Sequence, residues 1–330
     1  MVALIAGRLC AGREDGGAGR DRPKRLIKFH QSLPSDVCAA INTGAVLDVK
    51  GRERYRSRMI ARLMNGAGNK FILADVRGRA GVFNLSADSV KAMARAHPFD
   101  QLLVLEDSDT SDAFMRIWNS DGDEVGACGN GTRAAAWAMM QETGSDTLSL
   151  DTAGGVLLAR DAGPMSVSVD MGEPRLDWTE IPLVRPMDTL QLDFAVEKDG
   201  VRIEAPGAVS MGNPHAVFFI RDIANFPVTG LGPVVEHAPL FPERVNAGFA
   251  QILDARHIRL RVWERGAGIT AACGTGACAA LVAAHRRGLC DRQAMIHADG
   301  GDLSVEWRKS DNHVILTGPV EDEGPIELDI

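Results

Sequence analysis

The chain has 330 residues, enough to bury two cores of about 150 residues each, and its hydrophobic (45%) and charged (24%) fractions are those of an ordinary globular protein. Its formal net charge of −8 and the lack of a basic stripe in the body of the chain argue against a nucleic-acid-binding protein. No apolar run approaches the roughly 18 residues of a membrane span. The composition therefore predicts a soluble protein without nucleic-acid or membrane partners.

The first segment differs from the rest in charge. Residues 1–60 contain twelve Lys and Arg against six Asp and Glu, and the apolar run Val2 to Ala6 is too short for a signal-peptide core. A basic arm and a transit-like leader are both possible origins. Because Met59 and Met64 stand just before the first patterned segment, we favour upstream sequence translated from a start placed too early. We expect residues 1–58 to be a disordered extension.

The next elements form one pattern. The β-rich segments FILADV, QLLVLE and FMRIW lead to the turn ACGNGTR, and a helix of small residues is expected over Gly131–Met140. Hairpin strands follow in LSLDTAGGVLLARDAGPMSVSVDM. An alanine-rich helix without a polar face is normally buried.

The same pattern returns 145 residues later. FMRIWNSDGDEVGACGNGTRAAAWA falls on RLRVWERGAGITAACGTGACAALVA, with a second helix expected over Gly276–Arg286. Weaker similarity extends along roughly 110 residues, which indicates a duplicated domain. Trp118 and Trp263 occupy equivalent places, and we assign both to the core.

The repeat predicts an α/β fold of two pseudo-symmetric domains, each a mixed, mostly antiparallel sheet wrapped around a central helix. Residues 59–172 form the first domain and 173–318 the second, with a junction around Glu173–Pro186. The last strand, 319–330, is expected to return to the first domain.

Each turn places a cysteine where a helix begins. The first helical N–H groups lack intrahelical partners and carry the positive end of the helix dipole, so they favour a bound carboxylate or a thiolate. A single such cysteine is usually a packed small hydrophobe. Two in equivalent places, Cys128 and Cys273, would face each other across a cleft between the domains. That arrangement suits inversion of a stereocentre by removal and return of a proton.

The other cysteines suggest no further site. Cys278 and Cys290 lie in or after the second helix and are assigned to packing. The chain has no C-x-x-C pair and no His-x-x-x-His, so a structural zinc site is not expected. Without a secretory signal, the cytoplasm is the expected compartment, with reduced thiols.

Both turns with their flanks resemble the pyridoxal-independent diaminopimelate epimerases. The resemblance runs from about Met64 to the C-terminus and includes NGAGNKF, HPFDQLL, NSDGDEV, ACGNGTR, SMGNPH, RVNAGF, ERGAG and ACGTGACA. It implies interconversion of L,L- and meso-diaminopimelate for lysine and peptidoglycan precursor synthesis. It implies no metal, nucleotide or pyridoxal cofactor. A homodimer is our expectation.

Carried over position by position, the resemblance implies Cys128 as proton donor and Cys273 as proton acceptor. It places His215 and Glu264 where they tune the pKa values of the thiols. The implied substrate-binding residues are Asn69, Gln101, Asn119, Gly129, Asn130, Asn213, Asn246, Glu264, Arg265, Gly274 and Thr275. Arg265 suits a remote carboxylate, because a guanidinium matches a carboxylate with two hydrogen bonds.

Two departures and two alternatives accompany this interpretation. Asn65 and Lys70 stand where the family usually has His and Asp, which changes the expected charge at the rim of the cleft. A proline or hydroxyproline racemase-like enzyme of the same fold is one alternative. A non-catalytic amino-acid-binding protein is the other.

Overall fold

A computed structural model describes residues 46–47, 53–54, 58–79, 85–126 and 128–329. The chain forms two units, Met1–Ser57 and Arg58–Ile330. In the first, β1 (Val46–Leu47) pairs antiparallel with β2 (Glu53–Arg54). The expectation of disorder over 1–58 falls almost wholly on residues outside the described ranges.

The second unit contains two successions of elements with the same order. The first succession is β3 (Arg58–Gly66), β4 (Asn69–Asp75), α3 (Ala87–Ala96), β5 (Gln101–Glu106), β6 (Ala113–Asn119), β7 (Glu124–Val125), α4 (Gly129–Thr143), β8 (Thr147–Asp151), β9 (Leu157–Asp161) and β10 (Ser166–Asp170). The second is β13 (Gly207–Ser210), β14 (Pro214–Phe219), α5 (Val228–Glu236), β15 (Asn246–Asp254), β16 (His257–Glu264), β17 (Gly268–Ile269), α6 (Gly274–Arg286), β18 (Gln293–Ala298), β19 (Gly301–Trp307) and β20 (Val314–Pro319). A small hairpin, β11 (Ala195–Lys198) and β12 (Val201–Glu204), precedes the second succession.

Strand pairing repeats in the same way. In the first half β3–β4 is antiparallel, β4–β5 parallel, β5–β6 antiparallel, β6–β8 parallel, and β8–β9 and β9–β10 antiparallel. The second half gives the same series for β13–β14, β14–β15, β15–β16, β16–β18, β18–β19 and β19–β20. The predicted mixed sheets and the duplication are therefore present in the structure.

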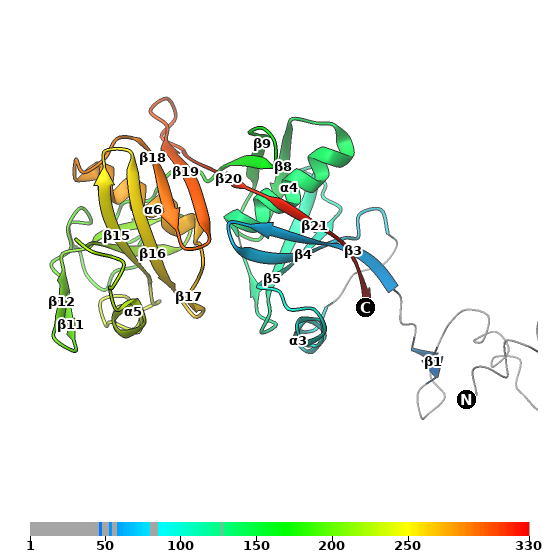
Figure 1. Ribbon diagram of the computed structural model, residues 1–330, viewed down its shortest axis with the longest axis horizontal. Coiled ribbons are helices and arrows are strands. Elements are labelled where there is room, and N and C mark those ends of the chain that lie inside the picture. The colour runs from blue at the N-terminus through cyan, green and yellow to red at the C-terminus, as the bar shows by residue number, and fades with distance from the viewer. Residues whose placement is uncertain (1–45, 48–52, 55–57, 80–84, 127, 330) are drawn as a thin grey trace, which may run out of the picture. The chain divides into compact units, whose positions relative to one another are not determined.

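The central helices α4 and α6 are largely buried, because the small residues along them let the surrounding strands approach closely. Ten of the fifteen residues of α4 are buried, and ten of the thirteen residues of α6. Each helix packs against the inner face of its own half's sheet, and Figure 1 shows α4 and α6 among the strands of their halves. Alanine and glycine allow this close approach, whereas α3 and α5 cover the outer faces with Val90, Met93, Leu231 and Val235.

Two segments join the halves. β10 pairs with β20, which also pairs with β19, so the two sheets share this ladder. β21 (Glu321–Asp329) then pairs antiparallel with β3 of the first half. Because Arg58–Ile330 form one compact unit, the predicted division at residue 172 stays a prediction.

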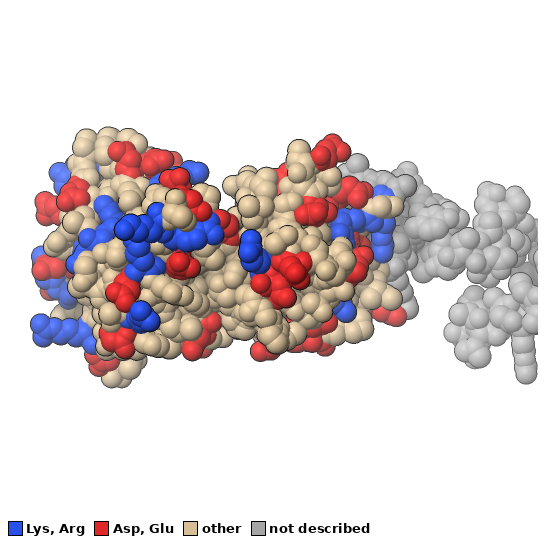
Figure 2. Space-filling model, turned by 90° about the horizontal axis from the view of Figure 1, so that it is seen from above, with Lys and Arg blue, Asp and Glu red and all other residues tan. Residues whose placement is uncertain are grey.

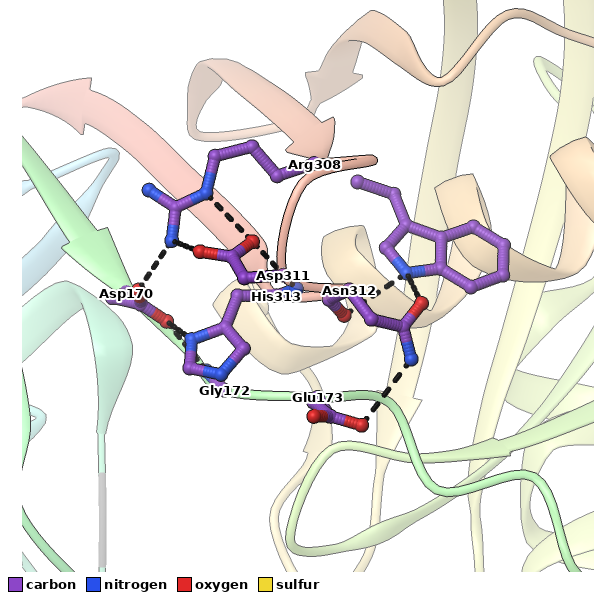
Figure 3. Close-up of polar contacts among 8 residues, drawn as sticks. Asp170, Gly172, Glu173, Arg308, Asp311, Asn312 and His313 are labelled. Atoms are coloured by element: carbon purple, nitrogen blue, oxygen red, sulfur yellow. Dashed lines mark hydrogen bonds and ion pairs between the residues drawn. The ribbon is translucent and has the colours of Figure 1, made fainter.

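A polar cluster lies where the chain passes from one half to the other. Asp170, at the end of β10, accepts hydrogen bonds from Arg308 Nη2 at 2.9 Å and from His313 Nδ1 at 2.8 Å (Figure 3). Arg308 also pairs with Asp311. The β19–β20 connection is thereby tied to the segment that enters the second half.

The described surface is mixed in charge. Basic and acidic side chains are interspersed over both halves on the face shown in Figure 2. None of the described helices is long and apolar enough to cross a membrane.

Candidate active site

Cys128 caps the first central helix. Its Sγ accepts a hydrogen bond from the backbone N–H of Gly131 at 3.3 Å, while the Thr132 hydroxyl donates to the Cys128 carbonyl at 2.8 Å. The helix starts at Gly129, two residues earlier than the sequence suggested. The glycine-rich tripeptide is thus itself helical, and the thiol sits directly at the helix N-terminus, where a negative charge is favoured.

Cys273 occupies the equivalent place before α6, which likewise begins two residues earlier than expected, at Gly274. Its side chain is buried, whereas that of Cys128 is partly exposed. Cys273 Sγ lies 3.6 Å from the Thr275 hydroxyl oxygen. The two predicted thiols therefore begin equivalent helices in equivalent halves.

The two turns touch through Asn130. Its amide Nδ2 donates to Asn69 Oδ1 at 2.6 Å and to the carbonyl of Ala272 at 3.2 Å. A Cβ on Gly274 would lie 3.2 Å from Asn130 Oδ1 and 2.9 Å from Leu316 Cδ2, so any larger residue here would displace these side chains. The N-termini of α4 and α6 are thus held next to each other, one from each half.

A polar chain supports Cys273 from the second half. Asn213 Oδ1 can only accept, so His215, whose Nε2 lies 3.0 Å away, carries its proton on Nε2. Asn213 Nδ2 in turn donates to Thr275 Oγ1 at 3.2 Å. The hydroxyl hydrogen of Thr275 is then free to point at Cys273 Sγ, which stabilises a thiolate there.

The turn after β16 brings two further predicted residues to the site. The Glu264 carboxyl accepts a hydrogen bond from the Thr270 hydroxyl at 2.6 Å, and its charge raises the pKa of the Cys273 thiol. The backbone N–H of Arg265 donates to Asn246 Oδ1 at 2.9 Å, and its exposed guanidinium donates to the Glu243 carbonyl at 2.9 Å. Asn246 lies beside His215 in the β14–β15 ladder.

The remaining predicted residues lie in the first half. Gln101 Nε2 donates to Asn119 Oδ1 at 2.9 Å across the β5–β6 pair. Among the described residues, no hydrogen bond joins this pair to the cysteines. At the two positions that depart from the family pattern, Asn65 Oδ1 accepts a hydrogen bond from the Gly68 N–H in the β3–β4 turn, and the backbone N–H of Lys70 donates to Asp100.

Burial controls the protonation of the site. It raises the pKa of Cys128 to about 11 and that of Cys273 well above its ordinary value, with the charge of Glu264 adding to both effects. Burial also raises the pKa of Glu264 and lowers that of His215 to about 3, so the imidazole is neutral. These surroundings thus favour neutral thiols, and a cationic group beside them would favour a thiolate.

Two residues that the sequence analysis did not single out lie against the site. Arg133, in α4, is fully buried, and its guanidinium nitrogens have no hydrogen-bond partner among the described residues. Its positive charge lowers the pKa of Cys128 and of Cys278. Glu236, at the end of α5, accepts from Trp263 Nε1 at 2.7 Å and from the Gly266 N–H at 2.9 Å. Arg133 belongs to the ACGNGTR motif, but no local signal marks Glu236.

Within the described residues, no group of three His, Cys, Asp or Glu side chains is arranged to hold a metal ion.

A model of the family described as "Diaminopimelate epimerase" matches residues 62–176 and 207–322, one segment in each half. The chain belongs to the diaminopimelate epimerase family. Both cysteine turns, and the ERGAG turn between them, fall inside the matched residues.

Curated relatives in this family are similar along most of their length. A diaminopimelate epimerase of Phenylobacterium zucineum is 53% identical over 259 residues, which cover 78% of this chain and 92% of the relative. Another, of Acidiphilium cryptum, is 50% identical over 260 residues, which cover 78% of this chain and 91% of the relative.

Solved structures of low sequence identity share the fold. A hydroxyproline epimerase from Agrobacterium vitis has a TM-score of 0.60 at 16% identity, covering 82% of this chain and 91% of that one. A PhzF-family phenazine biosynthesis protein of Bacillus anthracis has a TM-score of 0.59 at 14% identity, covering 83% and 100%. These likenesses confirm the predicted fold class and carry no inference about substrate.

Proposed function

We propose that the protein interconverts L,L- and meso-diaminopimelate by proton removal and return between Cys128 and Cys273. The observation that carries the proposal is the pair of thiols at two helix N-termini joined by Asn130, one from each half of a duplicated fold. Family membership and relatives at about half identity, all named for this activity, support the substrate.

The reaction requires one thiolate and one thiol. In one direction the Cys273 thiolate removes the α-proton and becomes a thiol, while the electron pair of the broken C–H bond moves toward the α-carboxylate. The Cys128 thiol then delivers a proton to the opposite face and becomes the thiolate. In the reverse direction the two roles exchange. Groups of this kind each supply roughly 10²–10⁴-fold.

Substrate charge explains how a buried thiolate arises. The α-ammonium group of the substrate brings a positive charge into a site where burial otherwise keeps both thiols neutral. The α-carboxylate would lie on the backbone N–H groups of the two helix N-termini, which Gly129, Asn130, Gly274 and Thr275 provide. Stabilising the charge that develops on this carboxylate in the transition state adds to the acid–base contribution.

The other end of the substrate is assigned to the exposed rim. Arg265 would take the remote carboxylate, and the amide side chains Asn69, Asn213 and Asn246 would hold the remaining polar groups. Gln101 and Asn119 complete the set from the first half. His215 and Glu264 would adjust the proton affinity of Cys273, His215 through Thr275 and Glu264 through its charge.

A direct experiment tests the substrate. The purified protein is incubated with diaminopimelate in deuterium oxide, and incorporation at the α-carbon is followed together with the change in stereoisomer ratio. Proline and hydroxyproline serve as competing substrates for the racemase alternative. Binding of diaminopimelate without exchange would favour the amino-acid-binding alternative.

The setting of the enzyme follows from the same proposal. A cytoplasmic homodimer fits a precursor enzyme of lysine and peptidoglycan synthesis, and no cofactor enters any step. Light scattering on the purified protein measures the oligomeric state.

A further inference from the structure

Glu236 lies outside the set of predicted site residues, yet its carboxylate holds the turn that carries two of them. The side chain is buried, with 3% of its surface exposed. Oε2 accepts the indole N–H of Trp263 at 2.7 Å, and Oε1 accepts the backbone N–H of Gly266 at 2.9 Å. One carboxylate thus binds the chain immediately before and immediately after Glu264 and Arg265.

The attachment to Trp263 is rigid. A Cβ on Gly232 of α5 would lie 2.4 Å from Trp263 Cγ, so the indole ring lies directly on the helix that ends at Glu236. The ring and the carboxylate are therefore both fixed relative to α5. Burial opposes the charged form of Glu236, but the hydrogen bonds from Trp263 and Gly266, together with the nearby charges of His237 and Arg244, lower its pKa.

The first half provides an internal comparison. There the turn after Trp118 is held by its own backbone and by neighbouring loop residues: Asn119 N donates to the Asp123 carbonyl at 2.8 Å, and Asp123 N to Asp121 Oδ1 at 3.0 Å. The residues of this first-half turn are not among the charged groups that shift the pKa of Cys128. The buried carboxylate of Glu236 belongs to the half whose turn carries Glu264, the carboxyl group whose charge raises the pKa of Cys273.

We propose that Glu236 is a positioning residue that fixes Glu264 against Cys273 and Arg265 at the rim by clamping Trp263 and Gly266. The assignment of Glu264 and Arg265 rests on the proposed function, but the clamp itself rests on the contacts above. Displacements of about 1 Å in a group that positions substrate cost about 10²-fold in rate.

Three variants separate positioning from folding. Glu236→Gln keeps the shape but removes the charge and one of the two acceptors. Trp263→Phe keeps an aromatic side chain but removes the indole N–H together with the five-membered part of the ring. Arg244→Gln is the matched control: it removes an exposed guanidinium that lies 3.6 Å from Glu236 Oε1, and it leaves both hydrogen bonds to Glu236 in place.

The first readout does not depend on the substrate. Each protein is alkylated with iodoacetamide over a range of pH, and modification of Cys128 and Cys273 is quantified separately by peptide mass spectrometry. Because Glu264 raises the pKa of Cys273, its release should move the midpoint of Cys273 alkylation to lower pH in Glu236→Gln, with a smaller shift in Trp263→Phe. The midpoint of Cys128 should move less, and Arg244→Gln should match wild type.

The second readout is kinetic. KM for diaminopimelate should rise about 10- to 100-fold in Glu236→Gln, because Arg265 is no longer held where it can bind the remote carboxylate. The rise in KM should exceed the fall in kcat. If wild type does not turn over diaminopimelate, the proposed function fails while the alkylation profiles still decide the role of Glu236. An unchanged Cys273 profile in folded Glu236→Gln would overturn the proposal. If that variant does not fold, an unchanged profile in Trp263→Phe would overturn it.

Discussion

The side-chain amide of Asn130 reaches from one half of the duplicated fold to the other and donates to the carbonyl of Ala272 at 3.2 Å. Ala272 precedes Cys273, and Asn130 follows Cys128 by two residues, so this bond fixes one thiol-bearing turn against the other. The same amide holds Asn69 Oδ1 at 2.6 Å. This side chain thus helps to fix the position of one acid–base group relative to the other.

We therefore expect Asn130→Ala to lose activity in excess of its loss of stability. Removing two hydrogen bonds of a buried amide should cost about 1–3 kcal/mol of unfolding free energy. The misplacement of the turns should lower kcat about 10²-fold. Thermal unfolding and deuterium exchange measure the two effects, and Asn225→Ala, an exposed asparagine outside the site, is the control. Normal kcat in a folded Asn130→Ala protein would contradict this role.

Arg265 is expected to control the use of the substrate. Among the described residues, the Glu243 carbonyl is the hydrogen-bond acceptor of its exposed guanidinium, which leaves other N–H groups of the guanidinium available for a carboxylate. Arg265→Ala should weaken diaminopimelate use by about 2–5 kcal/mol, and Arg265→Lys should recover only part of this, since a lysine cannot form the paired bonds. Steady-state kinetics with Arg256→Ala, another exposed arginine, as control test this. Near-normal kinetics for Arg265→Ala would reopen the racemase alternative.

Replacing Arg133 should change the pH dependence of Cys128 alkylation. Its buried charge lowers the pKa of Cys128, so Arg133→Met should move Cys128 alkylation to higher pH. The folded-state pKa of Arg133 itself is lowered by burial to about 10, which means that its charge disfavours the folded state at neutral pH. Arg133→Met should therefore be as stable as wild type or more stable. A large loss of melting temperature, or a Cys128 midpoint that does not rise, would show that the guanidinium has a partner in solution.

The segment before β3 should be dispensable. Met59 is 1% exposed and pairs with Leu328 in the β3–β21 ladder, so a protein that starts at Met59 keeps nearly all of this ladder. We expect it to retain its melting temperature and its activity. A start at Met64 is the contrasting variant: it deletes most of β3 and should abolish folding. A large loss on removal of residues 1–58 would show that they contribute to the fold.

The sequence predicted features that depend on local pattern or on repetition. The duplication located both cysteines before equivalent helices, and the small residues of Gly131–Met140 and Gly276–Arg286 predicted that both helices are buried. The helices start two residues earlier because the Gly-x-Gly segments are themselves helical, with Cys128 and Cys273 as caps, which glycine content alone does not indicate.

Contacts between distant residues were not predictable in the same way. Glu236 lies 27 residues before Trp263 in the chain, and neither residue type nor spacing indicates that they are bonded. Arg133 is an arginine on an otherwise small-residue helix, and pattern alone suggests exposure. Its complete burial depends on how α4 meets β20, which only the tertiary structure shows.

The central claim is that Cys128 and Cys273 act on opposite faces of the α-carbon. It is tested most directly by α-proton exchange in deuterium oxide with the single serine and alanine variants, starting separately from L,L- and meso-diaminopimelate. Each alanine variant should keep the wild-type melting temperature and lose epimerisation by roughly 10²–10⁴-fold or more. Cys128→Ser and Cys273→Ser, which each keep one thiol, should exchange the α-proton preferentially from opposite stereoisomers. If either alanine variant epimerises at close to the wild-type rate, the two-thiol mechanism is wrong.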